Sequence, residues 1–386
     1  MAGERRSART VNVGGVNIGG DAPISVQSMT NTRTDDVSST VRQIREIHHA
    51  GGELVRVAVP DRKAISALSG ITAASPVPVI ADVHYQHELA MDALEQGIAK
   101  LRINPGNIGG IDRLMRIVSR ARENNVPLRI GVNAASLEKE IREKYGGATP
   151  EALVESALNH VRALERVSFF DVVISLKASD VPTTYRAYRF MAGKVNYPFH
   201  LGITEAGPPR RGTIKSAVGI GALLMAGIGD TVRVSLTSDP VEEINAARLI
   251  LQFAGRRQFG VELVSCPTCG RSEIDVIKLV GEVENIIVGV EKPIKVAVMG
   301  CVVNGPGEAR DADLGVSGSA RKGIIFRHGR IIRRVPRELL IEAFREELQK
   351  LCAETGNGGE KNQRNGHNSG IQRRKNNYRC DPGFEK

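Results

Sequence analysis

Between about residues 24 and 257, the apolar positions alternate between two patterns. Short runs rich in β-branched and aliphatic residues are each followed by a longer stretch of amphipathic helical periodicity. One such stretch, TPEALVESALNHVRALERV, opens with Thr149 as a helix N-cap and Pro150 at the first helical position. The eight strand-like runs are SVQSMT (25–30), LVRVAV (54–59), PVIADVH (78–84), KLRINP (100–105), LRIGVN (128–133), VVISLKA (172–178), FHLGIT (199–204) and VRVSLTS (232–238). This α/β alternation predicts a (β/α)8 TIM barrel, with a doubly wound open sheet as the rival fold.

Two further regions flank this repeat. TVNVGGVNIGG (10–20) predicts a hairpin that plugs the bottom of the barrel. After residue 257, GVELVSCPTCG predicts a strand ending in a tight loop, 272–287 a helix, 294–301 a second buried strand and 335–354 a closing helix. We therefore expect a TIM-barrel substrate-binding domain over 1–258, a small α/β domain over 259–354 and a disordered basic tail over 355–386.

The composition is that of a globular protein with a large core, since 41% of the 386 residues are apolar and 25% are charged. No apolar run approaches the roughly 18 residues of a membrane span. The basic N-terminus lacks the apolar segment of a secretory signal. Five cysteines, an odd number, do not favour a disulfide framework. We therefore expect a cytoplasmic protein with no membrane partner, in which a CxxC motif binds metal or is redox-active.

The formal net charge of +10 raises the question of nucleic-acid binding. Residues 355–386 hold seven Lys and Arg against three Asp and Glu, and residues 1–10 hold three Arg against one Glu. The body between these ends is nearly balanced, and only 4% of the chain is aromatic. We therefore expect no nucleic-acid partner. A zinc-stabilised protein that binds nucleic acid through its basic ends is the alternative from another functional class.

Charged and polar side chains gather at the carboxyl ends of the predicted strands, where barrel enzymes carry their active sites. The basic members are Arg56, Arg102, Arg129, Lys177 and Arg233. The other members are Asp82, His84, Asn104, Asn133, Glu205, Ser235 and Thr237. Five cations at one mouth predict a site for a phosphorylated or multiply anionic small molecule. The alternative is that single arginines form structural ion pairs with Asp82, Glu53 or helix carboxylates.

Glu205 ends the seventh predicted strand and precedes the Pro- and Gly-rich basic loop AGPPRRGT. Among cations, its carboxylate would be held ionised and hydrogen-bonded. Such a group suits acid/base chemistry once substrate excludes water. A carboxylate that only balances arginine charge is the alternative.

Three cysteines define a candidate metal site. Cys266 and Cys269, in SCPTCGR, lie between a strand and a helix, and Cys301, in MGCVVNGPGE, ends the next strand. Backbone N–H groups at the helix start would stabilise an anionic thiolate–metal centre. Zinc and iron–sulfur sites usually have four ligands, so one is missing from this set.

The sequence offers three candidates for the fourth ligand. Cys352 falls on the apolar stripe of the closing helix, where a core thiol is expected, and Cys380 lies in the tail. The NGPGE turn can return Glu308 towards Cys301, and a carboxylate can ligate iron; an exposed turn carboxylate is the alternative. A structural zinc site would more often show a second CxxC, and none is present. A cluster with one labile iron is therefore favoured over zinc.

The same residues carry a resemblance to a known family. SCPTCGR, VMGCVVNGPGEA and DLGVSG, with VQSMTNT, VRVAVP, IADVHY, LRINPGNIG, RIGVN, SLKAS, ITEAG and RVSLTSDP, resemble the 4-hydroxy-3-methylbut-2-en-1-yl diphosphate synthases. The resemblance runs in order from about residue 8 to 350. It implies a pteroate-synthase-like TIM barrel followed by a small α/β iron–sulfur domain that is sulfite-reductase-like, in the compact bacterial two-domain type.

The resemblance also implies an activity in the non-mevalonate isoprenoid pathway. The family opens the ring of 2-C-methyl-D-erythritol 2,4-cyclodiphosphate with two electrons and loses water, giving (E)-4-hydroxy-3-methylbut-2-enyl diphosphate. Reduced flavodoxin or ferredoxin is the implied electron donor. A homodimer is also implied, in which the cluster domain of one chain caps the barrel of its partner.

Individual roles follow from the same resemblance. Glu205 matches the acid/base carboxylate of the family. A [4Fe-4S] cluster would be held by Cys266, Cys269, Cys301 and Glu308. The residues implied to bind the cyclic diphosphate are Arg56, His84, Arg102, Arg129, Asn133, Lys177, Arg233 and Ser235. A barrel synthase of the pteroate type, whose small domain is merely structural, is the remaining alternative.

Overall fold

The computed structural model describes residues 3–84, 86–270, 272–301 and 305–354. The side chains of Pro105 and Glu308 lie outside this description, and so does the predicted tail over 355–386. The chain divides into two compact units, Met1–Arg257 and Gln258–Lys386.

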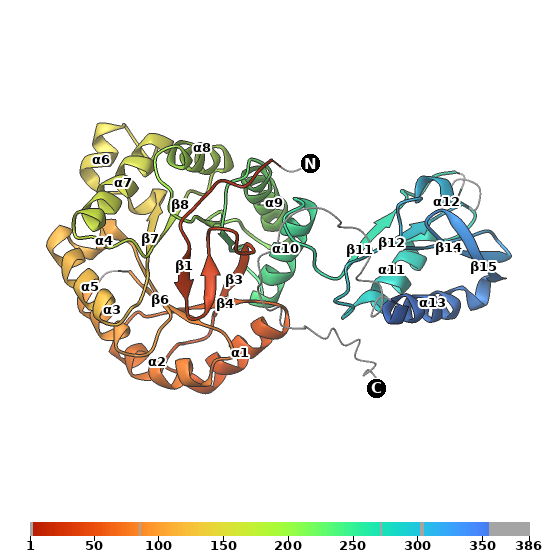
Figure 1. The fold of residues 1–386 in the computed structure, drawn as a ribbon, viewed down its shortest axis with the longest axis horizontal. Helices are drawn as coiled ribbons and strands as arrows, with labels where there is room; N and C mark the ends of the chain where they lie inside the picture. The colour runs from red at the N-terminus through yellow and green to blue at the C-terminus, as the bar shows by residue number, and fades with distance from the viewer. Residues whose placement is uncertain (1–2, 85, 271, 302–304, 355–386) are drawn as a thin grey trace, which may run out of the picture. The chain divides into compact units, whose positions relative to one another are not determined.

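Eight parallel strands form a ring in the first unit (Figure 1). They are β3 (Ser25–Met29), β4 (Leu54–Ala58), β5 (Val79–Val83), β6 (Lys100–Ile103), β7 (Leu128–Asn133), β8 (Val172–Lys177), β9 (His200–Leu201) and β10 (Thr231–Val232). From β3 to β8 each strand pairs with the next along the chain, and β10 pairs with both β3 and β9. A parallel bridge between Ile174 and Phe199 joins β8 to the segment entering β9. The predicted TIM barrel is confirmed, and the open sheet is wrong.

Helices lie around the outside of this ring (Figure 1). The longer ones are α1 (Val37–His49), α2 (Arg62–Ala74), α3 (His87–Leu94), α5 (Ile111–Glu123), α7 (Pro150–Arg166), α8 (Val181–Ala192), α9 (Pro209–Met225) and α10 (Pro240–Phe253). Short helices α4 (Pro105–Ile108) and α6 (Lys139–Lys144) follow β6 and β7. The predicted cap of α7 is confirmed, since the Thr149 hydroxyl accepts a hydrogen bond from the Ala152 N–H at 3.2 Å. Among the described residues, no helix is long and apolar enough to cross a membrane.

The last two barrel strands are shorter than the sequence predicts. The run 199–204 contains the two-residue strand His200–Leu201, and the run 232–238 contains only Val232 of the two-residue strand Thr231–Val232. Ile203 and Val234 nevertheless remain fully buried. The apolar pattern beyond each ladder therefore reflects burial of the chain rather than strand pairing.

The predicted hairpin at the barrel bottom is confirmed. Strands β1 (Val11–Val13) and β2 (Val16–Ile18) pair antiparallel, and Figure 1 shows them across the middle of the ring. Their apolar side chains pack against Leu54, Ile80 and Val173, which lie at or near the starts of β4, β5 and β8. The hairpin therefore closes the amino-terminal end of the barrel.

Above this plug, the barrel interior is polar. In a parallel sheet, residues two apart on one strand and register partners on the next share a face. Leu54, Ile80 and Val173 contact the plug, so they point into the barrel. By this alternation, the inward positions farther along the strands are occupied by buried polar residues. They include Gln27, Arg56, Asp82, Lys100, Arg102, Arg129, Ser175, Lys177, His200 and Thr231. Branched apolar side chains usually fill this space in such barrels, so the polar interior marks a binding site.

The second unit is a five-stranded mixed sheet. Its order is β11 (Val261–Ser265), β12 (Ile294–Met299), β13 (Leu314–Gly318), β14 (Lys322–Arg327) and β15 (Arg330–Pro336). The first three strands are parallel, and the last two add antiparallel. Helices α11 (Val276–Ile287) and α13 (Leu340–Glu354) contribute Val283 and Phe344 to an apolar core with Val296 and Val316.

Three features of this unit differ from the sequence predictions. Strands β13 to β15 were not predicted, and β15 occupies residues assigned to the start of the closing helix, which begins at Leu340. The predicted strand 294–301 ends at Met299. Helix α11 begins at Val276 rather than Ser272, because the Asp275 carboxylate caps it. Ser272 instead belongs to the cysteine loop, where its N–H donates to the Cys269 carbonyl at 3.0 Å.

Candidate active site

One buried carboxylate organises the first group of barrel cations. Asp82 on β5 forms an ion pair with Arg56, whose Nε lies 3.2 Å away, and accepts a hydrogen bond from Arg102 Nη1 at 2.8 Å. His84 Nε2 lies 2.5 Å from the same Arg102 nitrogen. Burial alone would raise the pKa of Asp82, but Arg56 and Arg102 hold that pKa well below its usual range. Asp82 is therefore ionised, and it fixes two arginines on neighbouring strands.

A second buried carboxylate fixes Arg233. Glu243 on α10 is 4% exposed, and it receives Arg233 Nε at 3.2 Å and Nη2 at 3.1 Å. It also accepts from the Ser28 hydroxyl at 2.7 Å and from the Leu236 N–H at 3.0 Å. The alternative of structural ion pairs is thus correct for Arg56, Arg102 and Arg233, although Glu53 pairs with Arg257 instead.

Other barrel cations have no such carboxylate among the described residues. Arg129 is 1% exposed, and its Nε and Nη1 atoms have no hydrogen-bond partner there. Lys100 is fully buried, and its Nζ is likewise unpaired. Lys177 is 6% exposed. Burial, followed by the neighbouring cations, lowers the pKa of Lys177 well below its usual value. An interior with surplus positive charge is prepared for an anion.

Two glycines make room for these side chains. A Cβ on Gly131 would lie 2.7 Å from Arg102 Nε, and one on Gly202 would lie 2.5 Å from Lys177 Nζ. Gly131 lies in the carboxyl-terminal half of β7, and Gly202 directly follows β9. The side chains of Arg102 and Lys177 therefore occupy space that a larger residue at position 131 or 202 would fill.

The remaining predicted residues lie at the barrel mouth. Asn133 ends β7 and Ser235 follows β10; both are half-buried. Glu205 follows β9, and its side chain is exposed. Its φ of +52° is in the left-handed region, which costs a residue with a Cβ roughly 1 kcal/mol. Such strain is often retained at functional sites.

Three interior residues were missed by the sequence reading. Lys100 and His200 are fully buried inside the barrel, and Glu243 anchors Arg233 from a helix. The signal for Lys100 was present, since it is a polar residue two positions before Arg102, and His200 is a polar residue inside the predicted strand run 199–204. Reading only the strand ends passed over them. Nothing in the local sequence distinguishes Glu243 from its exposed neighbour Glu242.

The candidate metal centre is at one edge of the second sheet. Cys266 directly follows β11, and Cys301 follows β12, its parallel neighbour. The Gly300 N–H donates to the Cys266 sulfur at 3.1 Å, and the Ser317 hydroxyl donates to the Cys301 carbonyl at 2.8 Å. A backbone N–H directed at a sulfur is the hydrogen bond that stabilises cluster-ligating thiolates.

The donor set is only partly assembled within the described residues. There, no three or more His, Cys, Asp or Glu side chains converge tightly enough to hold a metal ion. Glu308 ends α12 (Gly305–Glu308), and its side chain is outside the description. The sheet topology and the hydrogen bond to Cys266 fit a thiolate-held cluster. Cys352 packs against the domain core, as predicted for a core thiol.

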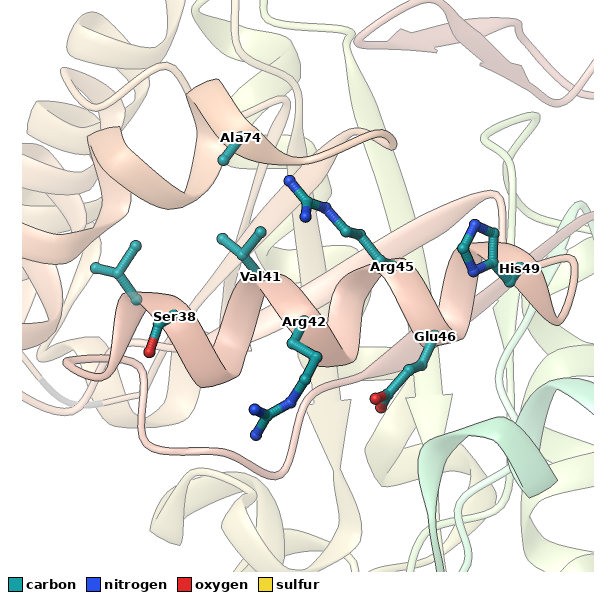
Figure 2. Close-up of a pocket in the computed structure, with 8 residues that line it drawn as sticks. Ser38, Val41, Arg42, Arg45, Glu46, His49 and Ala74 are labelled. Atoms are coloured by element: carbon teal, nitrogen blue, oxygen red, sulfur yellow. The ribbon is translucent and has the colours of Figure 1, made fainter.

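Surface hollows lie away from this chemistry. One is lined by α1 residues that include Arg42, Arg45, Glu46 and His49, with Ala74 from α2, and Figure 2 shows their side chains along the outside of the helix. A second lies between α11 and the start of α13. Neither contains a predicted site residue, so the barrel interior and the cysteine edge remain the candidate sites.

Comparison with known proteins covers both units. Residues 8–248 match the model of the GcpE TIM-barrel domain, and residues 262–350 match that of the GcpE protein C-terminal domain. A protein of Caldanaerobacter subterraneus named 4-hydroxy-3-methylbut-2-en-1-yl diphosphate synthase (flavodoxin) is 54% identical, over 91% of this chain and 99% of its own. A protein of the same name from Clostridium perfringens is also 54% identical, over 88% of this chain and 97% of its own.

Among solved structures, the 7,8-dihydropteroate synthase of Vibrio fischeri aligns with 64% of this chain and 99% of its own. The TM-score is 0.46 and the identity 12%, which is too distant to bear on the site. The two domain models and the full-length relatives, in contrast, agree along both units. The chain belongs to the GcpE family, whose curated relatives bear the name 4-hydroxy-3-methylbut-2-en-1-yl diphosphate synthase.

Proposed function

We infer that this chain catalyses the reaction of its family: reductive ring opening and dehydration of 2-C-methyl-D-erythritol 2,4-cyclodiphosphate to (E)-4-hydroxy-3-methylbut-2-enyl diphosphate. The single observation that carries the assignment, beside family membership, is the barrel interior. Among the described residues, six Lys and Arg side chains meet two buried carboxylates there, Asp82 and Glu243. Both carboxylates are already paired with Arg56, Arg102 and Arg233. A multiply anionic ligand supplies the missing negative charge.

The cations of this interior divide into two roles. Arg56, Arg102 and Arg233 are held by carboxylates, so their positions are set before the ligand arrives. Arg129 and Lys177 keep their donors for the diphosphate oxygens. His84, Asn133 and Ser235 are the proposed contacts at the mouth. Preset guanidinium groups orient the ring at a low entropic cost, because they do not reorganise when it binds.

Glu205 is the proposed acid/base residue. Its carboxylate follows β9 at the mouth, on backbone with a positive φ. Once substrate and the covering domain exclude water, this carboxylate would move the proton to the departing oxygen. Glu205→Gln should keep the same iron content and visible spectrum while abolishing turnover. A Gln variant that turns over at full rate removes Glu205 from the mechanism.

Cys266, Cys269, Cys301 and Glu308 are the proposed ligands of a [4Fe-4S] cluster. When bound, this cluster supplies electrons one at a time to the C–O bond that breaks. The backbone donor on Cys266 would stabilise its thiolate. A carboxylate is a harder and more easily displaced iron ligand than a thiolate, which makes Glu308 the ligand most easily released.

The partners are proposed from the same relatives. Their names include flavodoxin, which we propose as the electron donor, with ferredoxin as the other candidate. A homodimer would bring the cluster unit of one chain over the barrel of its partner. We propose the cytoplasm as the compartment and the domain roles as predicted: a substrate barrel over 1–258 and a cluster domain over 259–354.

Metal and sulfide analysis tests this function. After strictly anaerobic purification we expect about four iron and four sulfide per chain, and turnover of the cyclodiphosphate with a reductant. One zinc without sulfide, persisting after anaerobic reconstitution with iron and sulfide, makes the metal site structural. Turnover without any reductant points instead to a barrel synthase of the pteroate type.

A further inference from the structure

Lys100 is the deepest unpaired cation of the barrel. It is the first residue of β6 and is fully buried. Across the sheet, Lys100 is level with Ile80 and Arg56. Asp82, Arg102 and Arg129 are level with one another, two residues nearer the carboxyl ends of the strands. Its Nζ has no hydrogen-bond partner within the described residues. An ammonium in this position is removed from bulk solvent and has no counter-ion among those residues.

The groups that face Lys100 are mostly cations or neutral. Arg129 on β7 and Arg56 on β4 act on Lys100 electrostatically, and Lys100 acts on His200 on β9. Arg102, Lys177 and Arg233 are the other cations of the barrel interior. The two acids are already engaged, Asp82 with Arg56 and Arg102, and Glu243 with Arg233. No described carboxylate is left to pair with Lys100.

Electrostatics then favours the neutral amine. Removing a charge from water without a partner is unfavourable, so a buried group neutralises instead. Burial first, and then Arg129 and Arg56, lower the pKa of Lys100 well below its usual value. The same forces act on His200, whose two ring nitrogens are also unpaired among the described residues.

We propose that Lys100 is a neutral amine in the ligand-free barrel and takes up one proton when a diphosphate anion binds. This rests on the proposed function only in the class of anion. The proton comes from solvent and bonds to Nζ, so each bound anion gains a countercharge that the free site did not carry. A neutral Lys100 spares the ligand-free barrel a sixth positive charge beside Arg56, Arg102, Arg129, Lys177 and Arg233, and it supplies that charge when the ligand binds.

Titration calorimetry with inorganic pyrophosphate tests the proposal without requiring turnover. Binding is measured at one neutral pH in several buffers whose ionisation enthalpies differ, and the slope of the observed enthalpy gives the protons taken up. We expect uptake in the natural chain and one proton less in Lys100→Met. Lys278→Met, an exposed lysine in the second unit, is the matched control and should equal the natural chain.

Either of two results overturns the proposal. One is no proton uptake by the natural chain, and the other is the same uptake in Lys100→Met, which would assign the proton to Lys177 or His200. Failure of the proposed function is distinguishable, because pyrophosphate reports anion binding whether or not the cyclodiphosphate is turned over.

A second measurement covers a Lys100→Met variant that does not bind pyrophosphate. Without ligand, the unfolded chain should bind one more proton than the native state at Lys100, so native stability rises with pH below the usual lysine pKa. Chemical unfolding measures the free energy of unfolding at several pH values in this range. The slope of that free energy against pH should be smaller by one proton equivalent in Lys100→Met than in the natural chain. An unchanged slope contradicts a neutral Lys100.

Discussion

Glu205 combines two features at the scale of a single residue: a carboxylate at the barrel mouth and a left-handed backbone conformation. Its φ is +52°. Glycine accepts this conformation without the Cβ clash that costs other residues roughly 1 kcal/mol. A residue kept there despite the strain is expected to serve function rather than stability.

The corresponding prediction separates strain from chemistry. Glu205→Gly should leave the free energy of unfolding unchanged or raised by up to about 1 kcal/mol, because relief of strain offsets the extra freedom of the unfolded chain. The same variant should lose turnover. Thermal unfolding and a cyclodiphosphate assay on one preparation measure both.

Ser168 provides the matched control for this prediction. It is exposed, lies in the connection from α7 to the start of β8 rather than at a carboxyl end of a strand, and has a φ of +56°. Ser168→Gly should change the melting temperature as Glu205→Gly does and keep full turnover. If Glu205→Gly were strongly destabilised while Ser168→Gly was not, the Glu205 side chain would be a structural contact.

At the scale of elements, helix α10 acts on strand β10 through one side chain. Glu243 holds Arg233 with two hydrogen bonds and is itself fixed by Ser28 and Leu236. Charged hydrogen bonds of this kind contribute roughly 1.5–3 kcal/mol. Losing the orientation of Arg233 should therefore weaken substrate binding more than the chemical step.

Glu243→Gln should raise KM by about tenfold or more, in line with one lost charged hydrogen bond, while kcat and iron content change little. Glu242→Gln, the exposed neighbour on the same turn, is the control and should behave as the natural chain. Steady-state kinetics with a chemical reductant measure the split. A fall in kcat at unchanged KM contradicts a positioning role.

Asp82 links three neighbouring strands, and its charge makes their stability depend on pH. Its pKa is depressed because Arg56 and Arg102 outweigh the effect of burial. A depressed acid pKa contributes stability above the unfolded value of about 4, and that contribution is lost as pH falls below it. The barrel should thus weaken in acid through this residue.

Asp82→Asn should lower the free energy of unfolding at neutral pH by about 3 kcal/mol, since it leaves two buried guanidinium groups without their counter-ion. The difference from the natural chain should shrink below pH about 4, where the Asp82 carboxyl becomes protonated in the unfolded chain but stays ionised in the folded barrel. Urea unfolding at several pH values measures this. Asp35→Asn, in the exposed pair with Arg33, should show little change at any pH.

These elements also show what one sequence can predict. The eight strands and the hairpin plug follow from local apolar periodicity, and the cations at strand ends follow from barrel geometry. The ion pairs follow only in part. Asp82 and helix carboxylates were expected as possible partners, but which arginine each one holds, and the choice of Glu243 on α10, depend on how separate elements pack. Lys100 was missed because only the strand ends were considered, and its lack of a carboxylate partner among the described residues becomes visible only in the assembled ring.

At the scale of the whole molecule, the second unit also contains features that the sequence predicts and features that it does not. Parallel pairing of β11 with β12 brings Cys266 and Cys301 to one edge, as strand order predicts. The antiparallel β14–β15 hairpin was not foreseen, because its Arg-rich runs lack clear alternation. Residues 321–337, which contain this hairpin, hold seven Lys and Arg and no Asp or Glu.

Part of this charge is neutralised within the unit. Arg327 pairs with Glu354, and Arg333 with Glu346, both on α13. The side chains of Arg330 and Arg334 on the edge strand β15 are exposed. Basic residues can protect an edge strand from pairing, but they also attract an acidic protein surface over a distance that salt screens. Attraction of an acidic donor protein would affect the rate of electron delivery, whereas protection of the edge strand would not.

If the basic hairpin guides the protein donor, reduction by flavodoxin should slow as ionic strength rises, whereas reduction by dithionite should not show the same dependence. The double variant Arg330→Glu/Arg334→Glu should raise the KM for flavodoxin about tenfold, as expected for loss of steering charges, with unchanged dithionite rates and iron content. Arg345→Glu, an exposed charge reversal on α13, is the control. Equal flavodoxin kinetics in both variants would leave the hairpin charge as edge protection alone, because reversing it would then have no effect on the encounter with the donor.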